Sequence, residues 1–166
     1  MKNSELFLSV GTNLGNRQLN IDTALNLLGQ RIGTVLMKSS IFETEPWGFS
    51  SDNMFYNIAV KIETELQESQ ILFETKLIEK EMGRKSKSVC EYYCDRIIDL
   101  DLIFFDNLVI NTQELCLPHP KMTERLFVLQ PMAEIAPNMT HPVLHKTIKQ
   151  LLIELQNGRQ LSGGQI

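Results

Sequence analysis

The segment that decides the fold covers residues 95–105 and reads DRIIDLDLIFF, an aliphatic run interrupted by two aspartates. Asp is depleted from β-strands, which favour Val, Ile and Thr at such positions. Because strand side chains alternate, Asp99 and Asp101 are expected on one face, about 6.5–7 Å apart. That spacing suits one or two divalent cations held together with a polyphosphate. The alternative is a half-buried strand with a solvated acidic face. The opposite face is expected to carry Ile98, Leu100, Leu102 and Phe104.

The sequence outside this segment alternates between strand and helix patterns. Predicted strands cover residues 6–10, 35–42 and 55–63, and predicted helices cover residues 19–30 and 67–82. Together with the Asp-bearing strand, the order is βαββαβ, which is typical of the ferredoxin-like α+β fold: an antiparallel sheet with both main helices on one face. The appended elements are short strands near 108–110 and 115–117 and helices over 123–129, 131–135 and 147–155.

The strand at residues 55–63 shows the clearest alternation in the chain. One face carries Tyr56, Ile58, Val60 and Ile62, and the other carries Phe55, Asn57, Ala59 and Lys61. If the aliphatic faces pack against the helices, the second face of the sheet is left free. Phe55 and Asn57 should then share this free face with Asp99 and Asp101.

The composition is that of an ordinary globular protein. With 166 residues, of which 43% are hydrophobic and 22% are charged, we expect a single domain over residues 1–166. A net charge of -4 argues against a protein that coats nucleic acid. We expect no signal peptide and no membrane span, and three cysteines fit a reducing cytosol, so a cytoplasmic protein is predicted. A monomer is the expected state, since no apolar patch is identifiable from the sequence.

Cationic residues lie on both sides of the aspartates, namely Arg84, Lys85, Lys87, Arg96, Lys121 and Arg125. A single Lys or Arg in a loop is usually just solvated. Several of them beside paired carboxylates predict a polyphosphate site, in which the carboxylates hold Mg²⁺ and the arginines meet the remaining phosphate oxygens.

Two residues further along are ambiguous from the pattern alone. His119 lies between two prolines, a restricted backbone that suits either a positioned ligand-binding group or a rigid turn. Phe127 begins a short predicted helix and is interpreted as a core residue. The cysteines also leave a rival open, because a C-x₃-C…C-x₂-H zinc site is formally possible from Cys90, Cys94, Cys116 and His119. A ferredoxin-like binding module with a structural zinc site is therefore the alternative function.

Taken together, the motifs resemble those of the 6-hydroxymethyl-7,8-dihydropterin pyrophosphokinase family, and the resemblance covers nearly the whole chain. The most specific motif is residues 96–102, RIIDLDL. The other matching segments are Gly11 to Asn16, Thr44 with Pro46-Trp47-Gly48, Phe55-Tyr56-Asn57, Gly83-Arg84, and Pro118-His119 followed by Arg125 and Phe127.

The resemblance implies an enzyme of folate biosynthesis that transfers the pyrophosphoryl group of ATP to the hydroxymethyl group of 6-hydroxymethyl-7,8-dihydropterin and releases AMP. It implies two Mg²⁺ ions on Asp99 and Asp101, and catalytic roles for these residues with Arg84 and Arg96. The implied ATP contacts are Arg84, Tyr93, Arg96, Leu102, His119 and Arg125. The implied pterin contacts are Thr44, Pro46, Trp47, Phe55, Asn57 and Phe127, which replaces the core interpretation of Phe127.

The chain departs from the family pattern at several positions. Tyr93 stands where Trp is frequent, and Cys94-Asp95 replaces the more usual Gly-Pro pair. The loop over residues 84–96 looks about two residues longer than is common. Glu45, Glu114 and Cys116 also differ. These departures put loop closure and adenine contacts in doubt, and leave the reaction class unchanged.

Overall fold

The structure is a computed structural model, and it describes residues 2–84 and 94–163. Its main sheet has the strand order β2 (Thr34–Lys38), β4 (Phe55–Thr64), β1 (Ser4–Thr12) and β5 (Asp99–Phe105), and every neighbouring pair is antiparallel. A short strand, β3 (Phe42–Thr44), pairs with the beginning of β4. This is the antiparallel α+β order that the sequence predicts.

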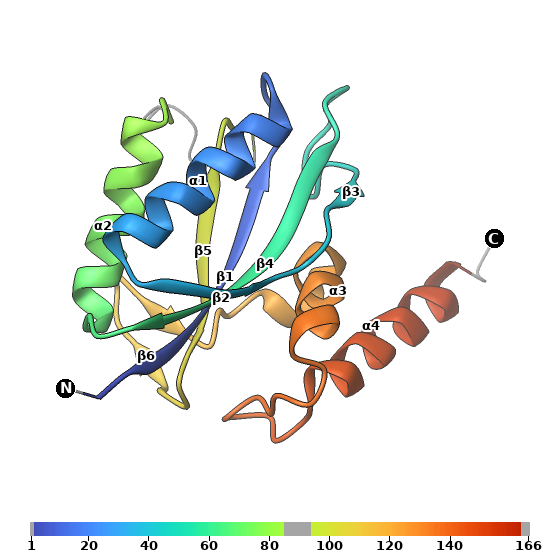
Figure 1. Cartoon of the computed structure of the whole chain (residues 1–166). Coiled ribbons are helices and arrows are strands. Elements are labelled where there is room, and N and C mark those ends of the chain that lie inside the picture. The colour runs from blue at the N-terminus through green and yellow to red at the C-terminus, as the bar shows by residue number, and fades with distance from the viewer. Residues whose placement is uncertain (1, 85–93, 164–166) are drawn as a thin grey trace.

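Two helices cover one face of the sheet, α1 (Arg17–Arg31) and α2 (Glu68–Glu81), as Figure 1 shows. The helix α1 begins where the Asn16 side chain accepts a hydrogen bond of 3.0 Å from the Leu19 N–H, a normal N-cap. In α2 the buried residues Ile71, Thr75, Ile78 and Glu79 follow helical spacing. The residues on β1, β4 and β5 that face these helices form the larger apolar core.

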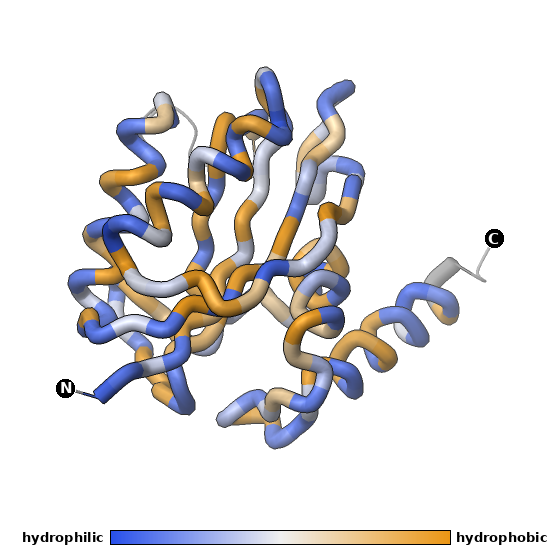
Figure 2. The backbone as a smooth tube through the Cα atoms, in the orientation of Figure 1, coloured by the Kyte–Doolittle hydropathy of each residue, from blue (hydrophilic) through white to orange (hydrophobic). Residues whose placement is uncertain are grey.

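Only half of the second face of the sheet is free, so the prediction of an open face is wrong for the other half. The helix α3 (Leu126–Ile135) packs against it, and α4 (Ile148–Gly163) packs on α3 and extends away from the sheet (Figure 1). Phe7, Ala59 and Phe104 of the sheet form a second core with residues of these two helices. Apolar side chains stand on this part of the face, so burying them against two further helices removes them from water. Figure 2 shows the mixture of hydrophobic and hydrophilic residues along α3 and α4 that such packing uses.

The position of Phe104 corrects the predicted alternation. Phe104 was expected on the helix face with Leu100 and Leu102, and the structure buries it in the second core. The register between β1 and β5 shifts, so that Leu8 pairs with Leu102 while Phe7 pairs with Phe104. Ile103 is thus an extra residue, and a bulge of this kind reverses the facing of every residue that follows.

Several element boundaries also differ from the predictions. The strand predicted over 35–42 divides into β2 and β3. The segment predicted as two helices forms a 3₁₀ turn, η1 (Met122–Glu124), followed by α3, which continues through Pro131. The short strands are β6 (Ile110–Asn111) and β7 (Cys116–Leu117), which pair with each other. Among the described residues, no helix is both long and apolar enough to span a membrane.

Candidate active site

A cavity of about 440 Å³ is lined by residues of the uncovered half of the second sheet face and, beyond the edge strand β5, by residues of α2. Residues from β1, β3, β4, β5 and α2 line it, together with the segments of residues 45–49 and 113–120 and the beginning of α3. The predicted site residues that line this cavity are Thr44, Trp47, Phe55, Asn57, Arg84, Arg96, Asp99, Asp101, Leu102, His119, Arg125 and Phe127. Pro46 is not among the lining residues. Tyr93 lies outside the residues that the structure describes.

The two aspartates lie side by side on β5, as their alternation predicts. Asp99 pairs with Gly11 and Asp101 with Ser9 across the neighbouring strand β1, and both small residues also line the cavity. The side chains of Asp99 and Asp101 keep 25% and 28% of their surface exposed. Because small residues flank them, the carboxylates are open to a ligand in the cavity.

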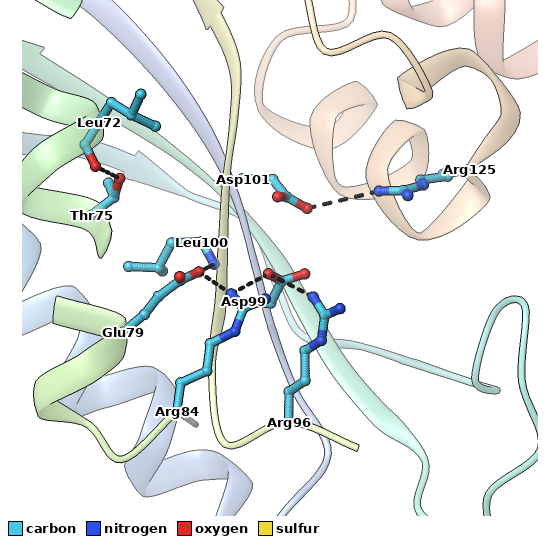
Figure 3. Close-up of polar contacts among 9 residues, drawn as sticks. All are labelled: Leu72, Thr75, Glu79, Arg84, Arg96, Asp99, Leu100, Asp101 and Arg125. Carbon is cyan, nitrogen blue, oxygen red and sulfur yellow. Dashed lines mark hydrogen bonds and ion pairs between the residues drawn. The ribbon is translucent and has the colours of Figure 1, made fainter. Parts of the chain in front are cut away.

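Asp99 is held by two arginines that approach from opposite sides (Figure 3). Its Oδ1 lies 2.9 Å from Nη1 of Arg84 and 3.1 Å from Nη1 of Arg96. The same Nη1 of Arg84 lies 2.5 Å from Oε1 of Glu79, which also accepts a hydrogen bond of 2.8 Å from the Leu100 N–H. Arg84 is therefore fixed between two carboxylates, one on α2 and one on β5.

Glu79 is a site residue that the sequence reasoning missed. It is buried, and it lines the cavity at the end of α2. A signal was present, because Glu79 stands next to Ile78 and four residues after Thr75, on the side of the helix that carries the apolar stripe. A carboxylate on a buried helix face needs a charged or hydrogen-bonding partner.

Asp101 differs from Asp99 in its surroundings. Partial burial, together with the neighbouring negative charge of Asp99, raises the pKa of Asp101 to about 7. The nearest cation is Arg125, whose Nη1 lies 3.8 Å from Oδ2 of Asp101 (Figure 3). The charge of Asp101 is thus less well balanced by nearby cations than that of Asp99, so Asp101 would gain more from a bound cation.

His119 stands at the edge of the same cavity as a neutral imidazole. Burial and the nearby charge of Arg125 lower the pKa of His119 to about 4. Its Nδ1 accepts a hydrogen bond of 3.2 Å from the Lys121 N–H. The neutral ring therefore carries its proton on Nε2, where it is a hydrogen-bond donor.

The other end of the cavity is aromatic. Trp47, Phe49, Phe55 and Phe127 line it, and the rings of Phe49 and Phe55 meet edge to face at 6.2 Å. Phe49 is a second residue that the prediction did not include, although an aromatic residue in a turn-rich loop is a usable signal. Phe127 packs against the second core and also lines the cavity, so it belongs to both.

A polar group lies among these rings. Asn57 is buried, and its Nδ2 donates a hydrogen bond of 2.7 Å to Oγ1 of Thr44. The guanidinium carbon of Arg125 lies 5.0 Å from the Trp47 ring centre and 5.5 Å from that of Phe127. Arg125 thus connects the aromatic end of the cavity with the carboxylate end.

Within residues 2–84 and 94–163, no group of three or more His, Cys, Asp or Glu side chains is arranged to hold a metal. The zinc site drawn from the cysteines also requires Cys90, which lies outside this range. A pair of carboxylates leaves most ligand positions of a hard cation to phosphate oxygens and water, which is how Mg²⁺ is usually held with a nucleotide. The residues present fit that mode of binding.

An antiparallel α+β domain with paired carboxylates, surrounding arginines and an aromatic, amide-bearing pocket defines an enzyme that acts on a polyphosphate and a flat polar ring. The family model described as 7,8-dihydro-6-hydroxymethylpterin-pyrophosphokinase (HPPK) matches residues 7–137. The chain belongs to this family. The predicted family, fold and pyrophosphokinase activity in folate biosynthesis are confirmed, and the alternative of a zinc-stabilised binding module is not favoured.

Two curated relatives are each named 2-amino-4-hydroxy-6-hydroxymethyldihydropteridine pyrophosphokinase. The Porphyromonas gingivalis protein is 42% identical over 138 residues, which is 82% of this chain and 93% of that protein. The Bacillus subtilis protein is 40% identical over 134 residues, or 80% and 78% of the two chains. The solved structure of wild-type Plasmodium falciparum HPPK-DHPS with SDX-DHP has a TM-score of 0.79 at 18% identity. The structural match covers 99% of this chain and 46% of the longer solved chain.

Proposed function

We propose that the cavity binds ATP and 6-hydroxymethyl-7,8-dihydropterin side by side, with the triphosphate over Asp99 and Asp101 and the pterin at the aromatic end. The observation that carries this proposal is the juxtaposition of the two chemistries in one cavity. Carboxylates and arginines line one part, and aromatic rings with a buried amide line the adjoining part. A site for phosphoryl transfer to a pterin needs both within reach of each other.

The pterin is proposed to stack between Phe55 and Phe127, with Asn57 as a hydrogen-bonding partner and Thr44, Pro46 and Trp47 beside it. Flat aromatic rings hold a planar heterocycle by stacking, and a buried amide both donates and accepts hydrogen bonds. Asn57 is already oriented by Thr44, so little freedom is lost when a ligand binds.

Asp99 and Asp101 are proposed to hold two Mg²⁺ ions together with the triphosphate. When bound, these ions would spread the negative charge that develops on the phosphate oxygens. Arg84 and Arg96 are proposed as catalytic residues that turn from Asp99 to the transferring group, and His119 and Arg125 as further phosphate contacts. Leu102 and Tyr93 are proposed as contacts on the nucleotide side.

In the reaction, the hydroxymethyl oxygen of the pterin forms a bond to the β-phosphorus of ATP. The bond from that phosphorus to the oxygen bridging the α-phosphate breaks, and AMP departs with the electron pair while the hydroxyl proton is lost to solvent or a carboxylate. The side chains contribute by orienting the two substrates and stabilising the charge of the transition state, because the phosphoryl group itself needs no covalent help from the protein.

The test is to incubate the protein with ATP, Mg²⁺ and the reduced hydroxymethylpterin and to look for AMP. AMP that forms only in the presence of the pterin supports the proposal, whereas ADP or no nucleotide product contradicts it. Asp99→Ala and Asp101→Ala should each abolish turnover and keep the fold by circular dichroism. Asp22→Ala, which removes an exposed carboxylate from α1, is the matched control and should retain activity.

We further propose that the chain acts as a single domain and as a monomer in the cytoplasm. The support is that residues of one chain line the whole cavity. Sedimentation at the concentration of the assay tests the monomer, and a dimer that is required for activity would contradict it.

A further inference from the structure

Three segments that are far apart in the sequence meet beside the cavity through a cluster of polar side chains. Asn13 follows β1, Asn53 is the second-last residue of the loop of residues 45–54, and Asp95 precedes β5. The loop of residues 45–54 carries Trp47 and Phe49 and is called the aromatic loop below. The cluster therefore joins the aromatic end of the cavity to the segment that leads into the carboxylate strand.

Asn13 is the buried centre of this cluster. Its Nδ2 donates hydrogen bonds to Oδ1 of Asp95 at 2.8 Å and to the Asn53 carbonyl at 3.2 Å. Its Oδ1 accepts a bond of 2.6 Å from the Arg96 N–H, and its own N–H donates to the Arg96 carbonyl at 3.0 Å. Both the N–H and the C=O of Arg96 are thus hydrogen-bonded to Asn13.

Asp95 uses its two carboxylate oxygens on two different segments. Oδ1 accepts from Asn13, and Oδ2 accepts from Nδ2 of Asn53 at 2.9 Å. A hydrogen bond from Ser51, with smaller effects from Asn13 and Asn53 and against the cost of burial, lowers the pKa of Asp95. Asp95 is ionised at neutral pH, and hydrogen bonds to a charged acceptor are stronger than neutral ones.

We propose that Asp95 is a positioning residue that fixes the aromatic loop and Arg96 relative to each other. Through Asn53 it holds the end of the loop that carries Trp47 and Phe49, and through Asn13 it holds the backbone of the next residue, Arg96. It touches neither substrate. The proposal rests on the proposed function, since it assigns the aromatic loop to the pterin and Arg96 to the phosphates.

The two branches of the contact predict different kinetic effects. Asn53→Ala removes one of the two side-chain hydrogen bonds from the aromatic loop to Asp95, the other being that of Ser51, so the pterin KM should rise about threefold with kcat nearly unchanged. Asp95→Ala removes the hydrogen bonds from Ser51 and Asn53 as well as that from Asn13, so the pterin KM should rise further, about tenfold, and kcat should also fall, roughly five- to tenfold. The double variant should match Asp95→Ala alone, because Asn53 Nδ2 reaches the cluster through Asp95.

The experiment measures AMP formation against both substrates, with thermal unfolding of each variant as a check of folding. Asp52→Ala, which removes an exposed carboxylate next to Asn53, is the matched control and should keep wild-type kinetics. Asp95→Asn keeps one acceptor oxygen and should recover part of the loss.

Wild-type kinetics in Asp95→Ala would overturn the proposal, and so would additive losses in the double variant. A fall in kcat for Asn53→Ala equal to that of Asp95→Ala would also overturn it, because the two branches would then not be separate. These results differ from failure of the proposed function, in which the wild-type protein itself forms no AMP from ATP and the pterin.

Discussion

Gly11→Ala should weaken pterin binding through a steric effect on Asn57. Gly11 pairs with Asn57 across β1 and β4, and a Cβ added there would lie 2.9 Å from the side-chain oxygen of Asn57. Ordinary contacts begin near 3.4 Å, so Asn57 must retreat by about 0.5 Å, the difference between the two distances. Asn57 is only 3% exposed and is bonded to Thr44, which leaves it little freedom to move without losing its orientation.

The expected cost is that of one strained buried hydrogen bond, about 1–2 kcal/mol, which corresponds to a rise of roughly 5- to 30-fold in the pterin KM. The ATP KM should change less than about twofold, because the new methyl group meets Asn57 and not the carboxylates. The assay is the initial rate of AMP formation against each substrate in turn.

A double-variant comparison separates the steric effect from a general disturbance of β1. In an Asn57→Ala background the added methyl group has no side chain to displace, so Gly11→Ala should cause almost no further loss. Equal losses in the presence and absence of the Asn57 side chain would refute the reasoning. Gly29→Ala is the control, since its Cβ would approach nothing closer than Val35 at 4.0 Å.

Three further predictions concern charge and close packing. Because the pKa of Asp101 is raised to about 7, the folded metal-free protein holds this proton more tightly than the unfolded chain and should lose stability as the pH rises from about 4 through 7. Mg²⁺ must displace the same proton, so its binding below pH 7 should release a proton and strengthen with pH. Calorimetry in two buffers of different ionisation enthalpy measures this proton, and Asp101→Asn should abolish it; a proton count of zero in the wild type at pH 6 contradicts the reasoning. Glu79→Gln removes the negative charge that pairs with Arg84, so it should lower kcat at least tenfold and the free energy of unfolding by about 1–2 kcal/mol. AMP formation and urea denaturation measure the two effects. An unchanged kcat would show that Arg84 does not need Glu79. Gly33→Ala should destabilise the protein by more than about 3 kcal/mol in the same denaturation, because its Cβ would lie only 2.1 Å from the backbone oxygen of Glu63. A loss below about 1 kcal/mol would show that the two backbone segments move apart easily.

The carboxylate pair was predictable because its evidence is local. Two aspartates at alternate positions in an aliphatic strand must share a face, and the same alternation placed Asn57 and Phe55 on that face. The register of β1 between β4 and β5, which the pattern along each strand does not give, then brings Asn57 and Asp99 to either side of Gly11.

The bulge in β5 shows where local reasoning ends. Up to Leu102 the alternation holds, but Phe104 turns to the other face because one residue is inserted opposite Phe7 and Leu8. The five residues around Ile103 carry no sequence signal that predicts the inserted residue. The bulge allows Phe104 to pack with Phe7 and Met132 in the second core, a gain that exists only when α3 is in place.

By itself, the sequence determined the main strands and helices, their order and, as far as Leu102 in β5, which strand residues face the same way, since these depend on neighbours within a few positions. Only the tertiary structure decided that α3, with α4 packed on it, covers half of the second face and that Glu79 holds Arg84 beside Asp99. The same is true of the cluster around Asp95, which joins positions 42 and 82 residues apart. Such contacts depend on how distant segments approach in space, and periodicity along one segment carries no information about the partner on another.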